Sequence, residues 1–237
     1  DVDARARDVK QFFDTGELNP ASNVQFGEGG AGAFSDGKLN TGIKDPRCRT
    51  VLQTLYEHGA PEEILYEGKP HIGTDKLPGV VKSIRDEIVS LGGSVCFETT
   101  LSDIRIEKGA VRGAYLTGAD GQTREIDTDC LILAVGHSAR DTFEALARLN
   151  IPLEPKPFSV GVRVEHKQLL IDRAQYGRFA GHPALGAADY KLAVRTKEGR
   201  GVYTFCMCPG GQVVCSSSEE GMVATNGMSL HARDGEN

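Results

Sequence analysis

The sequence predicts a protein of the mixed α/β class (an α+β mixture), in which helices and strands occupy largely separate stretches of the chain. Three observations indicate this class. Residues 77–91 carry apolar side chains at helical spacing, residues 94–126 read as short strands divided by turn residues, and β-forming residues dominate beyond Pro152. We therefore expect a helical part with a β-meander, followed by a mostly β part.

The helices are expected at 3–14, 46–56, 77–91 and from Ser138 onward. The third is signalled best, because Val80, Ile84 and Ile88 recur at helical spacing. At the start of the fourth, Ser138 and Asp141 fit a capping box, in which each side chain binds a free backbone N–H group near the helix start. These patterns predict amphipathic helices with one buried face each.

The strands are expected at 94–98, 101–107, 110–117 and 123–126, and later at 158–164, 191–195, 201–207 and 212–215. Lys108-Gly109 supplies a hairpin turn. The apolar run from Cys130 to Val135 is typical of a strand buried on both faces of a parallel sheet, so Cys130 is expected to be buried. Prolines between residues 150 and 157 place a domain boundary there, which divides the chain into 1–150 and 151–237.

Composition argues against two classes of protein. The chain has 237 residues and a net charge of −6, which argues against a nucleic acid as the main partner. No apolar run reaches the length of a membrane span and no signal peptide is visible, so a cytoplasmic protein is expected. The six cysteines show no disulfide spacing and are expected to be reduced, and no metal site is expected. The chain enters a helical pattern directly at Asp1, so we expect an internal piece of a longer protein.

The stretch from Gly27 to Asn40 is the most distinctive of the chain. Glycine is used at this density where the backbone needs positive φ or a close approach to another group. Exposed backbone N–H groups beside a lysine and a hydroxyl suit an anion such as phosphate. The residues expected to contact a bound group are Gly27, Gly29, Gly30, Gly32, Ser35, Asp36, Gly37, Lys38 and Leu39.

This stretch also contains Gly27-x-Gly29-x-x-Gly32, the spacing of the dinucleotide-binding fingerprint. The fingerprint requires a hydrophobic strand before it and an apolar helix after it. In the short segment directly before Gly27 only Val24 and Phe26 are apolar, and Ser35-Asp36-Gly37-Lys38 does not continue a helix. The sequence therefore favours a ligand-facing loop of another kind, with a plain flexible loop as the alternative.

A second candidate site lies where the apolar run ends at Gly136. Ligands of open α/β sheets bind at the carboxyl ends of such strands, so Ala134 and Gly136 are candidate contacts for a bound group. An ordinary strand-to-helix corner explains the pattern equally well. His137 follows directly and could orient a substrate or carry a proton, or it could be a loop histidine that binds backbone.

Cys208 and Arg163 complete the weak catalytic candidates. Cys206-x-Cys208 is too tight for common structural zinc sites, and two strand residues on one face explain it better than a redox dithiol. Arg163 could hold a substrate carboxylate with its planar fork, while an exposed ion pair with Glu165 is the favoured alternative.

The chain resembles the bacterial FAD-utilising dehydrogenases of the wider glutathione-reductase-like flavoprotein group. The stretches that carry the resemblance are 23–42, His71-Ile72-Gly73-Thr74-Asp75-Lys76-Leu77, 133–141, Pro157-Phe158-Ser159-Val160-Gly161-Val162-Arg163, 204–211 and Thr225-Asn226-Gly227-Met228-Ser229. Val135 stands where that group commonly has threonine, so a hydroxyl contact to a cofactor is not expected there.

The resemblance implies part of an FAD/NAD(P)-binding three-layer domain, lacking its N-terminal GxGxxG unit, followed by part of a β-rich substrate domain. It implies an FAD-dependent oxidoreductase that moves hydride or electrons through flavin to a small-molecule substrate, with NAD(P)H as a candidate electron donor. The glycine stretch would contact the flavin ring or phosphates, and Gly136 the adenosine side. The alternative is a cofactor-free, inactive fragment or interaction module. A hydrolase built on Ser35 or Cys208 lacks a convincing base.

Overall fold

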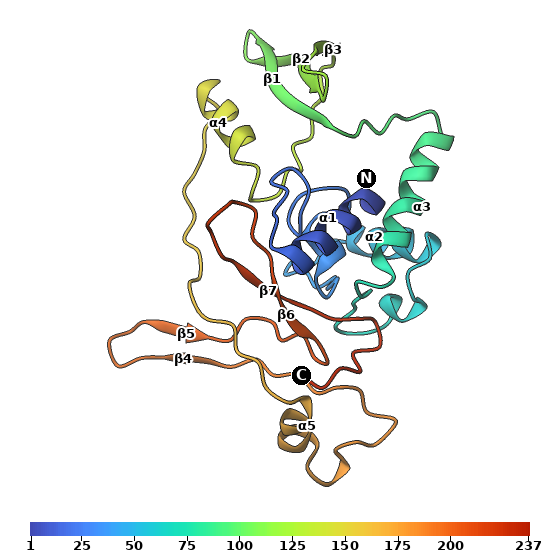
Figure 1. Cartoon of the computed structure of the whole chain (residues 1–237), viewed down its shortest axis with the longest axis vertical. Helices are drawn as coiled ribbons and strands as arrows, with labels where there is room; N and C mark the ends of the chain where they lie inside the picture. Colours follow the sequence, from blue (N-terminus) through green and yellow to red (C-terminus); the bar gives the residue numbers. More distant parts are fainter. The chain divides into compact units, whose positions relative to one another are not determined.

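The computed structural model describes all 237 residues, which form two compact units (Figure 1). The first unit joins Asp1–Glu87 to Val162–Asn237, and the second is Ile88–Gly161. Helices and antiparallel strands are both present, so the α+β class is confirmed. The predicted division into 1–150 and 151–237, and the three-layer FAD-binding domain, stay predictions.

The beginning of the first unit is helical. It contains α1 (Val2–Thr15), the 3₁₀ helix η1 (Ala31–Phe34), α2 (Arg47–Glu57), η2 (Glu62–Leu65) and most of α3 (Leu77–Ser90). A hydrophobic cluster binds α2, η2 and α3 together, and it buries Ala60, Ile64, Ile72, Leu77 and Val80. Leu39, from the tail of the glycine stretch, packs against this cluster and fixes the end of that stretch.

The remainder of the first unit comes from the end of the chain. It contains α5 (Gln168–Tyr176), the 3₁₀ helix η3 (Gly177–Phe179) and two separate hairpins. One hairpin pairs β4 (Ala193–Arg195) with β5 (Gly201–Tyr203), and the other pairs β6 (Gln212–Cys215) with β7 (Thr225–Met228). In the second hairpin Gly227 lies opposite Val213.

The second unit is built on the predicted β-meander. Its strands β1 (Thr99–Glu107), β2 (Ala110–Gly118) and β3 (Thr123–Asp127) pair in sequence order, all antiparallel. Lys108 and Gly109 both have positive φ, which is the backbone of the hairpin turn that their sequence predicts. Helix α4 (Arg140–Arg148) contacts β1.

Most predicted elements are confirmed within a few residues at their ends. These are helices α1 to α4 and strands β1 to β6. Helix α5 and strand β7 were not predicted. The capping box at α4 is wrong, because the N-cap is Ala139 and no side chain caps the helix. The Ser138 hydroxyl instead lies 3.0 Å from Nδ1 of His137.

Three predicted strands are absent, at 94–98, 130–135 and 158–164. The last two have strand-like sequences, but no strand of the chain pairs with them, and a strand needs a neighbour for its backbone N–H and C=O groups. Their apolar side chains are accordingly exposed, with Ile132 83% and Val162 88% accessible. The predicted burial of Cys130 is also wrong, since this thiol is exposed.

No helix in the structure combines the length and the apolar character needed to cross a membrane. The longest helices, α1 and α3, have 14 residues each, and the first presents charged side chains along its exposed face. A membrane-spanning helix needs about 20 predominantly apolar residues.

Candidate functional site

The first half of the glycine stretch surrounds the side chain of Arg5. This arginine lies on α1 and is 1% exposed. Its guanidinium donates to the carbonyl oxygens of Asn23 (2.8 Å), Val24 (2.8 Å) and Glu28 (2.7 Å). Burial lowers the pKa of Arg5 to about 10, which still leaves the group charged at neutral pH. The carbonyl groups of this turn therefore enclose a cation of the protein itself.

Neighbouring glycines allow this close packing. A Cβ on Gly27 would lie 2.5 Å from Cδ of Arg5, and one on Gly29 would lie 3.1 Å from the Ala33 side chain. Glu28 links this turn to α1 and α3. Its carboxylate accepts hydrogen bonds from the Val2 backbone N–H of α1 and from the Arg85 side chain of α3. The four-residue η1 stands where the dinucleotide fingerprint would require an α-helix. Cofactor contacts by Gly27, Gly29, Gly30 and Gly32 stay a prediction.

The second half of the stretch enters a buried polar cluster centred on Asp36. The side chain of Asp36 is 3% exposed. Its carboxylate pairs with Lys38 Nζ (2.8 Å) and Arg233 Nη2 (2.6 Å), and it accepts a hydrogen bond from the Ser229 hydroxyl. We call Asp36, Lys38, Cys208, Ser229 and Arg233 the Asp36 cluster. It joins residues about 200 positions apart in the sequence.

The charges of the Asp36 cluster stabilise one another. Burial alone would raise the pKa of Asp36, but the hydrogen bonds from Arg233, Lys38 and Ser229 outweigh it, and the pKa is lowered. Burial would likewise lower the pKa of Lys38, but Asp36 raises it. One carboxylate thus faces two cations, and the cluster keeps a net positive charge at neutral pH.

Cys208 lies beside Lys38, with Sγ 3.4 Å from Nζ. Burial raises the pKa of this thiol, and the positive charge of Lys38 offsets the effect only in part. The thiol is therefore protonated at neutral pH, which removes support from a hydrolase with Cys208 as its nucleophile. Cys206 is exposed and makes no bond to its neighbour, so the two sulfurs are free thiols.

Two stacked histidines adjoin the cluster. The rings of His71 and His231 lie 5.3 Å apart, and Nε2 of His71 lies 2.9 Å from the His231 carbonyl oxygen. Nδ1 of each ring is buried without a hydrogen-bond partner. Since a carbonyl oxygen only accepts, Nε2 of His71 carries the proton and its Nδ1 is a buried acceptor. Burial lowers the pKa of His71, which keeps the ring neutral.

His58 and His71 are expected to titrate on opposite sides of the ordinary histidine pKa of 6.5. His58 donates towards the Thr54 carbonyl oxygen and lies 2.7 Å from Glu87 Oε2, and these contacts raise its pKa. The pKa of His71 is lowered by burial. A proton-detected NMR titration of the imidazole carbons measures both values. Equal midpoints for the two rings would contradict the burial of His71 described above.

Gly73 fixes the approach of the His71 loop to the C-terminal segment. Its φ is +89°, and a Cβ there would lie 2.3 Å from the His231 backbone nitrogen. We expect Gly73→Ala to destabilise the protein by about 2 kcal/mol, because the free-energy cost of a left-handed alanine adds to the cost of the steric overlap. Gly68→Ala is the control, since it meets nothing within 4 Å and is not in the left-handed region. Urea unfolding measures both, and equal midpoints would refute the tight approach.

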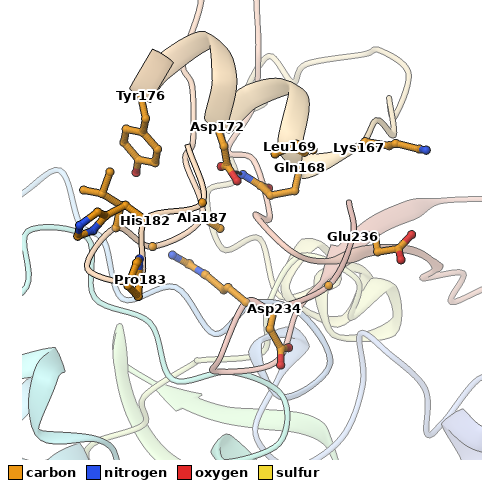
Figure 2. A pocket seen from close by; sticks show the side chains of 15 residues that line it. Lys167, Gln168, Leu169, Asp172, Tyr176, His182, Pro183, Ala187, Asp234 and Glu236 are labelled. Atoms are coloured by element: carbon orange, nitrogen blue, oxygen red, sulfur yellow. Dashed lines mark hydrogen bonds between the residues drawn. The ribbon is translucent and has the colours of Figure 1, made fainter. Parts of the chain in front are cut away.

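A pocket of about 570 Å³ opens next to the cluster (Figure 2). Its wall is formed by α5, the loop after it and the segment 233–236, so Arg233 belongs to both the pocket and the Asp36 cluster. Figure 2 shows Asp172 and Gln168 side by side, with Tyr176 and His182 on the other side. The volume of the pocket is within the range typical of small-molecule sites.

Buried Gln168 holds this pocket together. Its side chain donates to Asp172 Oδ1 (2.8 Å) and the Ala188 carbonyl oxygen (2.7 Å), and accepts from the Gly210 N–H (3.2 Å). Its backbone N–H donates to the Glu236 carbonyl oxygen (2.7 Å). No sequence pattern marks this residue, because one glutamine in a polar segment is indistinguishable from a surface residue.

The remaining predicted site residues have separate surroundings. Backbone hydrogen bonds join Gly37 and Leu39 to residues 70–72, and the Ser35 N–H donates to the Gly32 carbonyl oxygen of η1. Ala134, Gly136 and His137 belong to the second unit. Gly136 has a φ of +70° with open space where a Cβ would lie. The contact of Gly136 with the adenosine side of FAD stays a prediction.

A family match covers the part of the chain that carries the pocket. Residues 157–237 match the family model described as FAD-dependent protein, C-terminal domain-like. This match supports a relation to FAD-dependent proteins for the C-terminal third of the chain, which supplies Cys208, Ser229 and Arg233 to the Asp36 cluster.

A whole-chain relative is found in Clostridium beijerinckii. The chain is 53% identical to it over 238 residues, and the relative is described as an uncharacterized protein. The match covers 100% of the chain and 44% of the relative, so the chain spans less than half of that protein's length.

Proposed function

We propose that the chain is part of an FAD-dependent oxidoreductase that acts on a small-molecule substrate, with NAD(P)H as a candidate electron donor. The observation that carries the proposal is the match of residues 157–237 to the FAD-dependent C-terminal domain-like family. The Asp36 cluster supports it, because it joins the glycine stretch to that matched region through Lys38 and Cys208.

Lys38 fits the flavin ring of FAD, whereas residues 23–34 do not fit its diphosphate. The turn at 23–28 offers carbonyl oxygens to Arg5, and η1 is too short to present a helix dipole, so residues 23–34 do not fit a diphosphate. Lys38 fits the ring system better. Its side chain is 22% exposed, and its ammonium group has N–H donors of the kind that the carbonyl oxygens and ring nitrogens of a flavin accept.

We therefore assign Lys38 to the flavin ring. FAD, when bound, supplies the transfer of hydride or electrons. Asp36 keeps Lys38 charged and fixes its position, while Arg233 and Ser229 hold Asp36 in turn. The pocket beside Arg233 offers space for a small molecule within the same unit.

A visible absorption spectrum of the purified chain tests the proposal. Bound flavin would colour the protein yellow, and added FAD would restore the bands if the cofactor were lost during purification. A chain that stays colourless with added FAD would favour the alternative of a cofactor-free, inactive piece or interaction module. That alternative has a supporting observation of its own, since Arg5 already explains the carbonyl-lined turn.

A further inference from the structure

Arg163 has no carboxylate partner in its unit. An exposed ion pair with Glu165 would explain an arginine at this position, but Glu165 Oε1 instead accepts from Asn237 Nδ2 (2.9 Å) and, weakly, from the Val213 N–H (3.5 Å). The only hydrogen bond of the guanidinium in the unit is a long one, 3.4 Å, to Asn226 Oδ1. Most of its donors are therefore available, and the side chain is half-buried.

Arg163 and Cys208 meet at Gly227 of strand β7. The point that a Gly227 Cβ would occupy lies 2.6 Å from Cys208 Sγ and 3.5 Å from Arg163 Nη1. A side chain at position 227 would fill the space between the thiol and the guanidinium, so glycine keeps that space open. The thiol also contacts Lys38 Nζ, at 3.4 Å.

The local charge favours an anion. Lys38 and Arg233 share the single carboxylate of Asp36, and Arg163 adds a further positive charge without a counterion. An arginine fork with free donors matches the two oxygens of a carboxylate.

We propose that Arg163, with Asn226 and Cys208, forms the subsite that binds a carboxylate group of the substrate. This inference rests on the proposed function, because it places the substrate beside the lysine assigned to the flavin ring. It narrows the substrate to small molecules that carry a carboxylate.

Selective alkylation of Cys208 tests the subsite without any flavin. Iodoacetate carries a carboxylate and iodoacetamide is its neutral counterpart, so their relative rates report an anion site next to the thiol. Rates at Cys208 and at exposed Cys130 are followed by fragment-ion mass spectrometry of the whole chain. We expect the iodoacetate-to-iodoacetamide ratio at Cys208 to exceed that at Cys130 by about threefold or more, and acetate, at constant ionic strength, to reduce the excess.

The variant Arg163→Gln should lower the ratio at Cys208 towards that at Cys130, while Arg178→Gln, which removes an exposed arginine elsewhere in the unit, should leave it unchanged. Equal ratios at both cysteines of the unmodified protein would overturn the subsite. So would an excess that survives Arg163→Gln, or a Cys208 that reacts with neither reagent. The flavin spectrum is independent of these outcomes, so either proposal can fail alone.

Discussion

Replacing Arg5 by alanine is expected to lower the free energy of unfolding by about 4 kcal/mol. The guanidinium is 1% exposed and binds the carbonyl oxygens of Asn23, Val24 and Glu28. Alanine would leave those oxygens buried without donors and would open a cavity beneath Phe34, whose ring lies 4.7 Å from the guanidinium carbon. Urea unfolding followed by far-UV circular dichroism measures the loss.

Arg7→Ala is the matched control for this prediction. Arg7 lies on the same helix, is exposed and should change the free energy of unfolding by about 0.5 kcal/mol or less. Arg5→Lys keeps the charge but cannot reach three carbonyl groups in one plane, so an intermediate loss is expected. If Arg5→Ala were as mild as Arg7→Ala, the turn would not depend on Arg5, and its glycines would again require a ligand to explain them.

Replacing Asp36 by asparagine is expected to cost about 3 kcal/mol at neutral pH, because Lys38 and Arg233 would face each other without the carboxylate between them. The loss should depend on pH. The pKa of Asp36 is lowered on folding from 3.8, so its contribution is complete above that value and disappears as the pH falls through the folded pKa. The two proteins should therefore converge in stability in strong acid.

Asp14→Asn is the control for Asp36→Asn, because it removes an ion pair on the surface rather than a buried one. Asp14 pairs with Lys10 on the surface of α1, where its side chain is 57% exposed. Such pairs contribute little, and we expect a change of about 0.5 kcal/mol or less. Unfolding curves recorded between about pH 7 and pH 2 provide the comparison. An Asp36→Asn deficit that stays constant over this range would refute the buried, charged state of Asp36.

The elements that depend on residues close together in the sequence were predicted correctly. The spacing of Val80 and Ile84 predicts α3, and Lys108-Gly109 predicts the first hairpin of the meander, since both patterns act over a few residues. The run 130–135 shows the opposite case. Its apolar residues predict a buried strand, but a strand also requires a partner, and none of the strands in the chain pairs with it.

The candidate site was predicted in part. Asp36 and Lys38 were identified from the unusual composition of the glycine stretch, and both lie in the polar cluster. Ser229 and Arg233 were not assigned a role, because nothing in their own neighbourhood indicates that they meet a residue about 200 positions away. The role of Arg5 was hidden for the same reason, since a charged residue on a polar helix is ordinarily exposed.

We propose that the Asp36 cluster contributes to a flavin-binding site. A titration of the chain with FAD, followed by the difference spectrum of the visible flavin bands, measures this contribution. We expect a saturable perturbation that is strongly weakened by Lys38→Gln and retained by Arg178→Gln. A perturbation of equal size in Lys38→Gln, or none in the unmodified chain, would contradict it.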